Sequence, residues 1–336
     1  MKERIGWIEF LSGVMIIWMI IYHIFIFTGN KESQICEDLY RIFFFFMPWF
    51  FFKSGMFVKE IPIKNVIVSG FKKLLVPYFL FSIFGYIAYV IQQVIISDIS
   101  VDSMFIDPVT TLLFTGSVLG NLPLWFLLAL FLDKVLWQLF IKLKFNNYHI
   151  ALLSFIICFG GYLWGIKIPF YLWFTFSGLF FYSMGDLFRN LQFKDIVFLL
   201  AIILYIIAIF FFPNSVQMRS NSLEFGYYAL WPVTGLAAII VWNNLSYNIE
   251  TIKSRMPLLN KVWGGGSLVG HNSLYLFITH SLILVPASAA VKSQFTNLGQ
   301  FCIVFFVVAT LLPVFSIFAK SLLDTVEQRN KNIQKY

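Results

Sequence analysis

The chain contains few charged residues. Asp, Glu, Lys and Arg make up 12% of its 336 residues, hydrophobic residues make up 60%, and the mean hydropathy is +0.82. Soluble proteins carry about 25% charged residues because their surfaces face water. The shortage of charge therefore excludes an ordinary soluble domain and indicates a protein whose outer surface faces lipid.

Cysteine is also scarce. The three cysteines, Cys36, Cys158 and Cys302, lie far apart in the sequence and form no CxxC or Cys/His pattern. An odd number of widely spaced cysteines argues against a complete disulfide framework. The spacing also predicts no structural metal, because zinc sites need closely spaced Cys and His ligands.

Acidic residues are fewer than basic ones, 16 against 24, and the formal net charge is +8. We predict no nucleic-acid partner, because no basic cluster is interleaved with aromatic residues in a water-exposed segment. In a membrane protein, an excess of Lys and Arg is typical of cytoplasmic loops.

Long hydrophobic stretches occupy most of the chain. A helix that crosses a hydrocarbon core of about 30 Å needs about 20 mostly apolar residues. Charges, prolines and glycines divide the sequence into ten candidates. They are residues 6–28, 39–58, 74–97, 109–132, 148–165, 168–188, 195–213, 226–246, 266–288 and 297–320. We therefore predict an all-α polytopic membrane protein of about ten transmembrane helices, forming one domain over residues 1–336.

Glycine and proline predict irregular structure in two places. The candidate span 109–132 contains Gly116, Gly120, Asn121 and Pro123, so it is expected to begin with a re-entrant or surface piece. The run 264–266 consists of three glycines and is expected to form a flexible entry to the ninth helix.

The basic residues predict the orientation of the chain. With the N-terminus inside, most of them fall in inner segments. The exceptions are Lys53, within a span, and the outer residues Lys31, Arg41, Lys167, Arg219 and Lys292. Positive charge in short loops is retained on the cytoplasmic side. The bias predicts that both termini are cytoplasmic. A multi-pass protein of this kind is expected in the inner or plasma membrane of the cell, surrounded by lipid.

Few ionisable groups fall within the predicted spans. Such groups cost roughly 2.5–3.5 kcal/mol on insertion scales and are functional candidates for that reason. The candidates are Glu9, His23, Lys53 and His280.

His23 and His280 lie on different predicted helices at a similar depth, in the outer half of the membrane. Two imidazoles at one level can line a single cavity, and a neutral imidazole is the usual general base for a hydroxyl. The alternative is that each ring is a packing residue whose polar atoms are satisfied locally.

The remaining candidates also have two interpretations each. Glu9 is either an interfacial acid near a helix N-terminus or an acidic partner in a site. Lys53 either extends its amine towards the cytoplasmic interface or faces an anionic donor molecule. Lys72 and Lys73 are either ordinary inner-side charges or a phosphate site at a cytoplasmic mouth.

Five segments, taken in order, resemble the membrane-bound acyltransferase-3 family, whose members O-acylate sugars of cell-surface polysaccharides and related acceptors. They cover most of the chain, and the ten-helix pattern is similar as well. The segments are Glu9 to Gly13 with His23, Met47 to Gly55, Lys72 to Tyr78, Leu124 to Leu127, and Gly270 to Leu274 with His280.

The resemblance implies transfer of an acyl group, usually acetyl from acetyl-CoA on the cytoplasmic side, to a hydroxyl of a glycan acceptor. It implies that His23 is the catalytic base, with Glu9 and His280 as further catalytic residues. The donor's contacts would come from Ser12, Lys53, Lys72 and Lys73. The acceptor's contacts would come from Trp125, Asn272 and Ser273.

The sequence departs from the family at two positions, of which one is Gly70, where a second basic residue of the family's helix-three pair would fall; the other lies in helix one. The family pattern places an Arg or Lys upstream of the helix-one His, and that position is Ser12 here. We hypothesise that Lys53, from the second predicted span, replaces the lost cation. Two other functions stay open: a transporter for a polysaccharide or lipid-linked glycan, and a divergent, inactive member of the family. The oligomeric state is open as well.

Overall fold

The computed structural model describes residues 5–96, 100–164, 168–189, 196–211, 230–292 and 294–333. Helices dominate these residues, and their β-structure is one isolated bridge between Val118 and Asn121. The predicted all-α class is therefore confirmed. The chain divides into two compact units, each assembled from three separate segments. The single domain over residues 1–336 stays a prediction.

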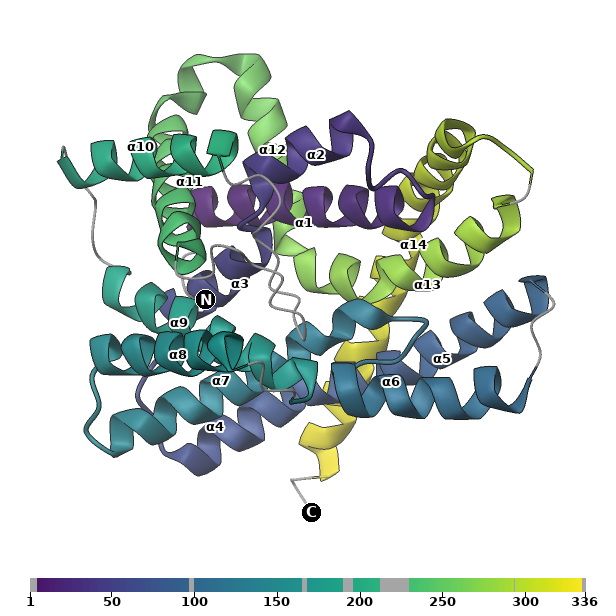
Figure 1. Ribbon diagram of the computed structural model, residues 1–336, viewed down its shortest axis with the longest axis horizontal. Helices are drawn as coiled ribbons and strands as arrows, with labels where there is room; N and C mark the ends of the chain where they lie inside the picture. The colour runs from purple at the N-terminus through teal and green to yellow at the C-terminus, as the bar shows by residue number, and fades with distance from the viewer. Residues whose placement is uncertain are drawn as a thin grey trace. The chain divides into compact units, whose positions relative to one another are not determined.

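Unit 1 comprises Met1–Met19, Gln34–Val66 and Leu132–His271. Its complete helices are α2 (Gln34–Phe43), α3 (Phe46–Met56), α8 (Asn147–Leu163), α9 (Phe170–Phe188), α10 (Ile196–Phe211), α11 (Trp231–Ile252), η4 (Lys253–Arg255) and α12 (Pro257–His271). Within this unit α9 packs against both α3 and α8, and α10 packs against α11 (Figure 1).

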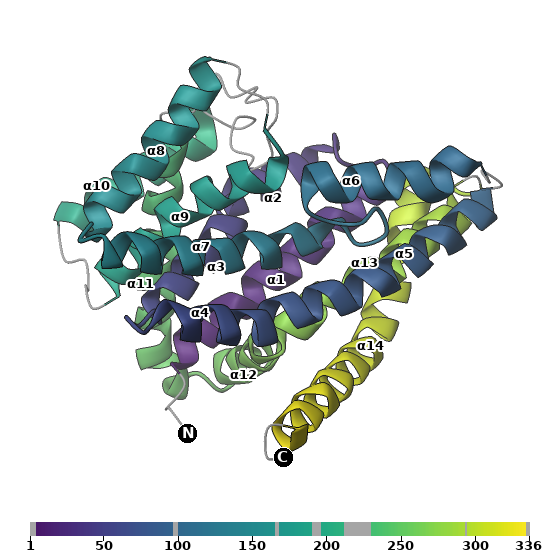
Figure 2. The same cartoon turned by 90° about the horizontal axis from the view of Figure 1, so that it is seen from below.

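Unit 2 comprises Ile20–Ser33, Ile67–Phe131 and Asn272–Tyr336. Its complete helices are η1 (Phe71–Leu75), α5 (Val76–Ile96), η2 (Asp102–Ile106), α6 (Asp107–Thr115), η3 (Leu122–Leu124), α13 (Ser273–Val291) and α14 (Asn297–Ile333). Here α13 packs between α5 and α14 (Figure 2). Three further helices, α1 (Gly6–Phe27), α4 (Ile63–Gly70) and α7 (Trp125–Lys142), contribute residues to both units.

Several of the described helices have the length and apolar character needed to cross a membrane. Five satisfy both criteria: Gly6–Phe27, Ile63–Ile96, Leu122–Lys142, Ser273–Val291 and Asn297–Gln328. Asn147–Gly161 and Ile196–Phe211 are apolar but shorter. The membrane character is thereby supported, whereas the count of ten spans and the cytoplasmic termini stay predictions. Parts of the spans 195–213 and 226–246, together with Lys167 and Arg219, lie outside the described residues.

The second predicted span, 39–58, is two helices instead of one. α2 ends at Phe43 and α3 begins at Phe46. Pro48 explains the break, because proline has no backbone N–H and its ring clashes with the carbonyl four residues earlier in a helix interior. In the observed structure Pro48 lies in the first turn of α3, where its missing N–H has no helical partner to lose.

The predicted interruption of the span 109–132 is confirmed. α6 ends at Thr115, and Gly116 follows it with a φ of 73°, a left-handed conformation that glycine adopts without steric cost. The chain then turns between Val118 and Asn121 and enters η3, and α7 begins at Trp125. The hydroxyl of Tyr78 on α5 donates to the carbonyl of Gly116 at 2.9 Å, which fixes this connection to α5 within unit 2.

The prediction of a flexible entry at residues 264–266 is wrong. All three glycines lie inside α12, which continues to His271, and the helix break falls at Asn272 instead. Two of the glycines on α12 lie against α1. A Cβ atom at Gly266 would collide with the ring of Phe10, and one at Gly270 would collide with the carbonyl of Glu9. Small residues therefore permit a close approach of the two helix backbones, as is common between membrane helices.

Candidate functional site

His23 and His280, the two histidines predicted to lie deep in their spans, meet in unit 2. Nε2 of His280 on α13 lies 3.1 Å from Nδ1 of His23 on α1. The two rings are stacked, with centroids 5.1 Å apart and planes 17° apart. The expectation that the two imidazoles lie at one level is therefore confirmed, and the contact brings together helices that are distant in the sequence.

His280 is held by its own helix. Its Nδ1 lies 2.7 Å from the carbonyl oxygen of Phe277, one turn earlier. The hydroxyl of Ser281 lies 3.2 Å from its Nε2. The His280 side chain is fully buried, at 0% exposure, whereas His23 is partly exposed. Of the pair, His23 is the ring that another molecule can reach.

The connection between α6 and α7 supports this part of α13. The side-chain amide of Asn121 donates to the carbonyl of Ile278 at 2.9 Å. Phe126 packs edge-on against Phe277, with ring centroids 5.5 Å apart. Sequence analysis treated Asn121 only as a sign of irregular structure. Its position two residues before the Pro-Leu-Trp-Phe segment that begins at Pro123 was the one available signal of its role in holding α13.

A second polar cluster lies in unit 1, at the N-terminal end of α1. Nζ of Lys53 donates to Oγ of Ser12 at 2.6 Å. Ser12 is fully buried, and its own hydroxyl donates to the carbonyl of Ile8 at 2.6 Å. The ammonium of Lys53 also lies 5.5 Å from the ring centre of Trp49 and 6.0 Å from that of Phe50, distances within the range of cation–π attraction.

Glu9 lies one helical turn before Ser12 on α1 and interacts electrostatically with Lys53, so it belongs to the same cluster. One of its carboxylate oxygens lies 3.6 Å from Nδ1 of His271, at the end of α12. This contact depends on Gly270, whose lack of a side chain lets α12 approach the backbone of Glu9. Sequence analysis missed His271, although it stands inside the Gly-His-Asn-Ser segment that resembles the family pattern. Its side chain is partly exposed, so it extends the acidic and basic cluster towards the surface of the unit.

A comparison with protein families identifies the family of the chain. The model of the acyltransferase-3 family, described as an acyltransferase domain, matches residues 5–319. The chain belongs to the acyltransferase-3 family. The resemblance drawn from five sequence segments is thereby confirmed, and the protein is a membrane acyltransferase in general terms. The searches of curated proteins and of solved structures found no match.

In this acyltransferase-3 chain, the position that departs from the family pattern is also the one that Lys53 contacts. The hydrogen bond between Nζ of Lys53 and Oγ of Ser12 places a cation beside the buried serine. The geometry supports the hypothesis that an amine from α3 stands in for the cation missing from α1. The functional role of Lys53 remains a prediction.

Five residues predicted to contact the donor or the acceptor lie in unit 2 of the acyltransferase. Lys72 and Lys73 are exposed on η1. Asn272 is the N-cap of α13, where its carbonyl accepts the backbone N–H of Tyr275, and the first residue of that helix is Ser273. Trp125 is the first residue of α7, and its ring packs edge-on against Phe126. Their predicted roles, donor binding for the lysines and acceptor binding for Trp125, Asn272 and Ser273, remain predictions.

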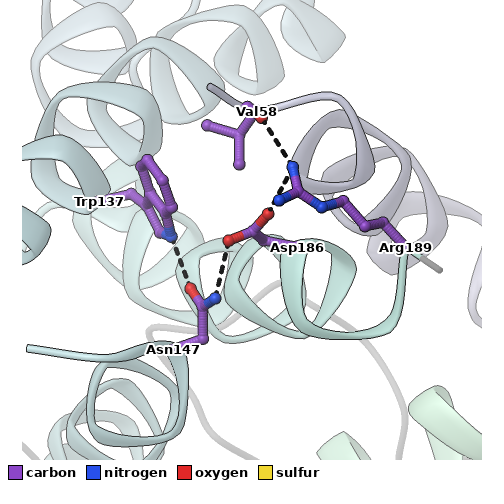
Figure 3. Close-up of polar contacts among 5 residues, drawn as sticks. All are labelled: Val58, Trp137, Asn147, Asp186 and Arg189. Carbon is purple, nitrogen blue, oxygen red and sulfur yellow. Dashed lines mark hydrogen bonds and ion pairs between the residues drawn. The ribbon is translucent and has the colours of Figure 1, made fainter. Parts of the chain in front are cut away.

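Unit 1 of the acyltransferase contains a further polar network (Figure 3). Nε1 of Trp137 donates to Asn147 at 2.8 Å, and the amide of Asn147 donates to Asp186 at 2.8 Å. Asp186 pairs with Arg189 at 3.2 Å, and Arg189 donates to the carbonyl of Val58 at 3.2 Å. The network joins α7, α8, α9 and the end of α3. The sequence did not predict it, because its members lie on four separate segments and no sequence pattern joins them.

The described residues contain no group of three or more His, Cys, Asp or Glu side chains that could hold a metal ion. Acyl transfer from a thioester needs a base and a means of stabilising the transition-state oxyanion, and neither depends on a metal. The expectation of a metal-free site stays a prediction.

Proposed function

We propose that this protein transfers an acyl group, most simply acetyl, from a cytoplasmic acyl-CoA to a hydroxyl of a cell-surface sugar or polysaccharide. Membership of the acyltransferase-3 family supports acyl transfer in general. The observation that carries the proposal for this chain is the contact of 3.1 Å between His23 and His280. It gives the chain an oriented imidazole pair within helices that are apolar enough to cross a membrane.

His23 is the proposed general base. In the transfer step the acceptor hydroxyl loses its proton to His23, and its oxygen forms a bond to the acyl carbon. The carbon–sulfur bond of the thioester then breaks, and the proton passes to the departing thiolate of CoA. A positioned base of this kind contributes about 10²–10⁴-fold to the rate.

The donor is proposed to bind through the basic residues. Lys53, beside Ser12, supplies a partly buried cation, and Glu9 lies in the same cluster through its contact with His271. Lys72 and Lys73 are exposed and suit phosphate groups, which lysine binds as a point charge. Acetyl-CoA enters this scheme as a substrate.

The proposed setting is the inner or plasma membrane, with about ten spans and both termini in the cytoplasm. The asymmetric distribution of Lys and Arg along the sequence supports this orientation. It would put the inner basic residues on the side where acyl-CoA is made and leave the outer half of the protein to the glycan acceptor.

The test is acetyl analysis of surface glycans from host cells with and without the protein. We expect ester-linked acetyl to fall when the gene is removed and to return with the wild-type chain. His23→Ala should fail to restore it. His149→Ala is the matched control, since His149 is exposed in the first turn of α8 and takes no part in the proposed site. Equal acetylation with His23→Ala and wild type would reject His23 as the base.

A further inference from the structure

The proton positions on the His23–His280 pair follow from the partners of His280. Its Nδ1 lies 2.7 Å from the carbonyl oxygen of Phe277. A carbonyl oxygen only accepts hydrogen bonds, so Nδ1 of His280 carries a hydrogen.

The environment of His280 favours its neutral form. The ring is 0% exposed, and the ion pairs of the described residues do not include it. Burying a cation without an anionic partner costs far more than burying a neutral ring. A neutral His280 with its hydrogen on Nδ1 has its lone pair on Nε2.

Nε2 of His280 therefore accepts the hydrogen bond from its neighbour at 3.1 Å, which is Nδ1 of His23. The hydroxyl of Ser281, 3.2 Å from the same lone pair, can also donate to it. From this order of donors we infer that His280 is a positioning residue that holds His23 in the Nδ1–H tautomer. The basic lone pair of His23 is then on Nε2. The inference rests on the proposed function, in which His23 is the base.

This arrangement has a chemical consequence for the transfer step. When Nε2 of His23 takes the proton of the acceptor hydroxyl, the ring becomes an imidazolium. Its Nδ1–H is already directed at the lone pair of His280, so the new charge is stabilised without rearrangement of the ring. An orienting group of this kind, which holds a histidine in one tautomer, is worth several orders of magnitude in serine proteases.

Two substitutions of His280 separate this role from packing. Gln carries an amide oxygen that can accept from Nδ1–H of His23, whereas Phe keeps a flat ring and accepts nothing. In membranes supplied with labelled acetyl-CoA, His280→Phe should lower kcat for glycan acetylation by about 100-fold or more, with KM for acetyl-CoA unchanged. His280→Gln should retain most of the activity, and His149→Gln is the matched control. Equal losses in the Gln and Phe variants would contradict the inference.

A measurement independent of catalysis decides the tautomer itself. In protein labelled with ¹⁵N at histidine, protonated and unprotonated ring nitrogens give separate NMR signals, and the His23 signals are those absent from His23→Asn. We expect hydrogen on Nδ1 of His23 in the wild type, and a shift towards the Nε2–H form in His280→Phe.

Hydrogen on Nε2 of His23 in the wild type would overturn the inference, as would a tautomer that does not respond to His280→Phe. The wild-type spectrum is decisive even if the Phe variant fails to fold. A chain with Nδ1–H on His23 but no acyl transfer would reject the proposed function and leave the tautomer assignment intact.

Discussion

Among single residues, Lys53 has the most unusual position. Its ammonium is partly buried, donates to the hydroxyl of Ser12 at 2.6 Å and lies over two aromatic rings. A lysine in an apolar helix usually extends its amine to the interface, which was one of the two expectations for it. In the structure the amine reaches Ser12 on the neighbouring helix, at the position where the family pattern has its cation.

We therefore expect Lys53→Met to weaken donor binding. Hydrogen bonds to charged groups contribute about 1.5–3 kcal/mol, which corresponds to a rise of roughly 10- to 100-fold in KM for acetyl-CoA. Met has a similar length and no charge, so the variant should fold. The measurement is the rate of glycan acetylation against acetyl-CoA concentration in membranes.

A double variant that moves the cation from α3 to α1 provides the control. Ser12→Lys combined with Lys53→Met returns the cation to α1 and should recover part of the activity that Lys53→Met loses. If Lys53→Met acetylates as well as wild type, the amine has no part in donor binding.

Asp133 on α7 is a second residue that simple patterns do not explain. It is 0% exposed, and neither of its carboxylate oxygens has a hydrogen-bond partner among the described residues. It lies against Gly178 on α9, where a side chain would collide with its Oδ2 and with the ring of Phe51.

We expect Asp133→Leu to stabilise the protein. A buried polar group without a partner costs about 1–3 kcal/mol, and Leu has a similar branched shape without that cost. The check is the thermal unfolding midpoint in detergent, with Asp133→Asn, which keeps a polar side chain, as the comparison. A folded Leu variant that loses acyl transfer would show instead that the carboxyl group acts in the reaction.

At the scale of elements, close helix contacts determine where the polar clusters form. α12 approaches α1 through Gly266 and Gly270, and this contact brings His271 to Glu9. α9 approaches α3 in the same manner: a Cβ at Gly185 would collide with the carbonyl of Phe52, and one at Gly55 with that of Tyr182. Because Lys53 lies on α3, its position depends on the second of these contacts.

Glycines on a single helix allow a matched test of this packing. Gly270→Ala should destabilise the protein by about 1–3 kcal/mol, because the new methyl group overpacks against the backbone of α1. Gly264→Ala, on the same helix, has open space around it and should stabilise by about 0.4–1 kcal/mol. Thermal unfolding of both variants in detergent measures the difference. Similar shifts in the two would contradict the close contact between α1 and α12.

The sequence predicted the elements better than their contacts. Apolar runs of about 20 residues identified most helices, and the glycines and Pro123 located the break before α7. The three glycines at 264–266 were misread as a flexible link, because glycine permits both a loose chain and close helix packing, and only the neighbouring helix decides. Pro48 was available as a sign of the break before α3 but was outweighed by the apolar run around it.

The candidate site was predicted only in part, because some of its residues are unusual for their place in a helix and others are not. His23 and His280 were found because an imidazole deep in an apolar span is rare, and their shared depth could be counted. His271 and Asn121 were missed because each lies at a helix end, where polar residues are ordinary. Their contacts, to Glu9 and to the backbone of Ile278, depend on helices distant in the sequence.

At the scale of the whole molecule, the number of spans predicted from the sequence exceeds the number of described helices that are long and apolar enough to cross a membrane. Five described helices are long and apolar enough to cross a membrane, two more are apolar and shorter, and the sequence pattern predicts about ten spans. The short helices α2 and α3 both overlap the single predicted span 39–58, so the number of helices exceeds the number of spans there. The distribution of Lys and Arg in the loops provides an independent criterion for the number and orientation of the spans.

Reporter fusions test the predicted orientation. A fluorescent protein that matures only in the cytoplasm should fluoresce when fused after Tyr336, and should be dark when inserted at Gln294, between α13 and α14. Insertion at Glu60, between α3 and α4, should fluoresce. Fluorescence at Gln294 would contradict the ten-span arrangement, because that loop is predicted to be external.

The neighbouring side chains of Ser12 and Lys53 also constrain how such a site can change over generations. A chain that kept a cation on both helices would hold two like charges in contact, and a chain with neither would leave Glu9 as the only charge beside the serine. If the cation moves from one helix to the other by single substitutions, the chain therefore passes through a state with two cations or a state with none, and both are unfavourable. A pattern search along one helix finds a serine where the family has a cation, whereas a search for charges close together in space finds the amine of Lys53 beside that serine.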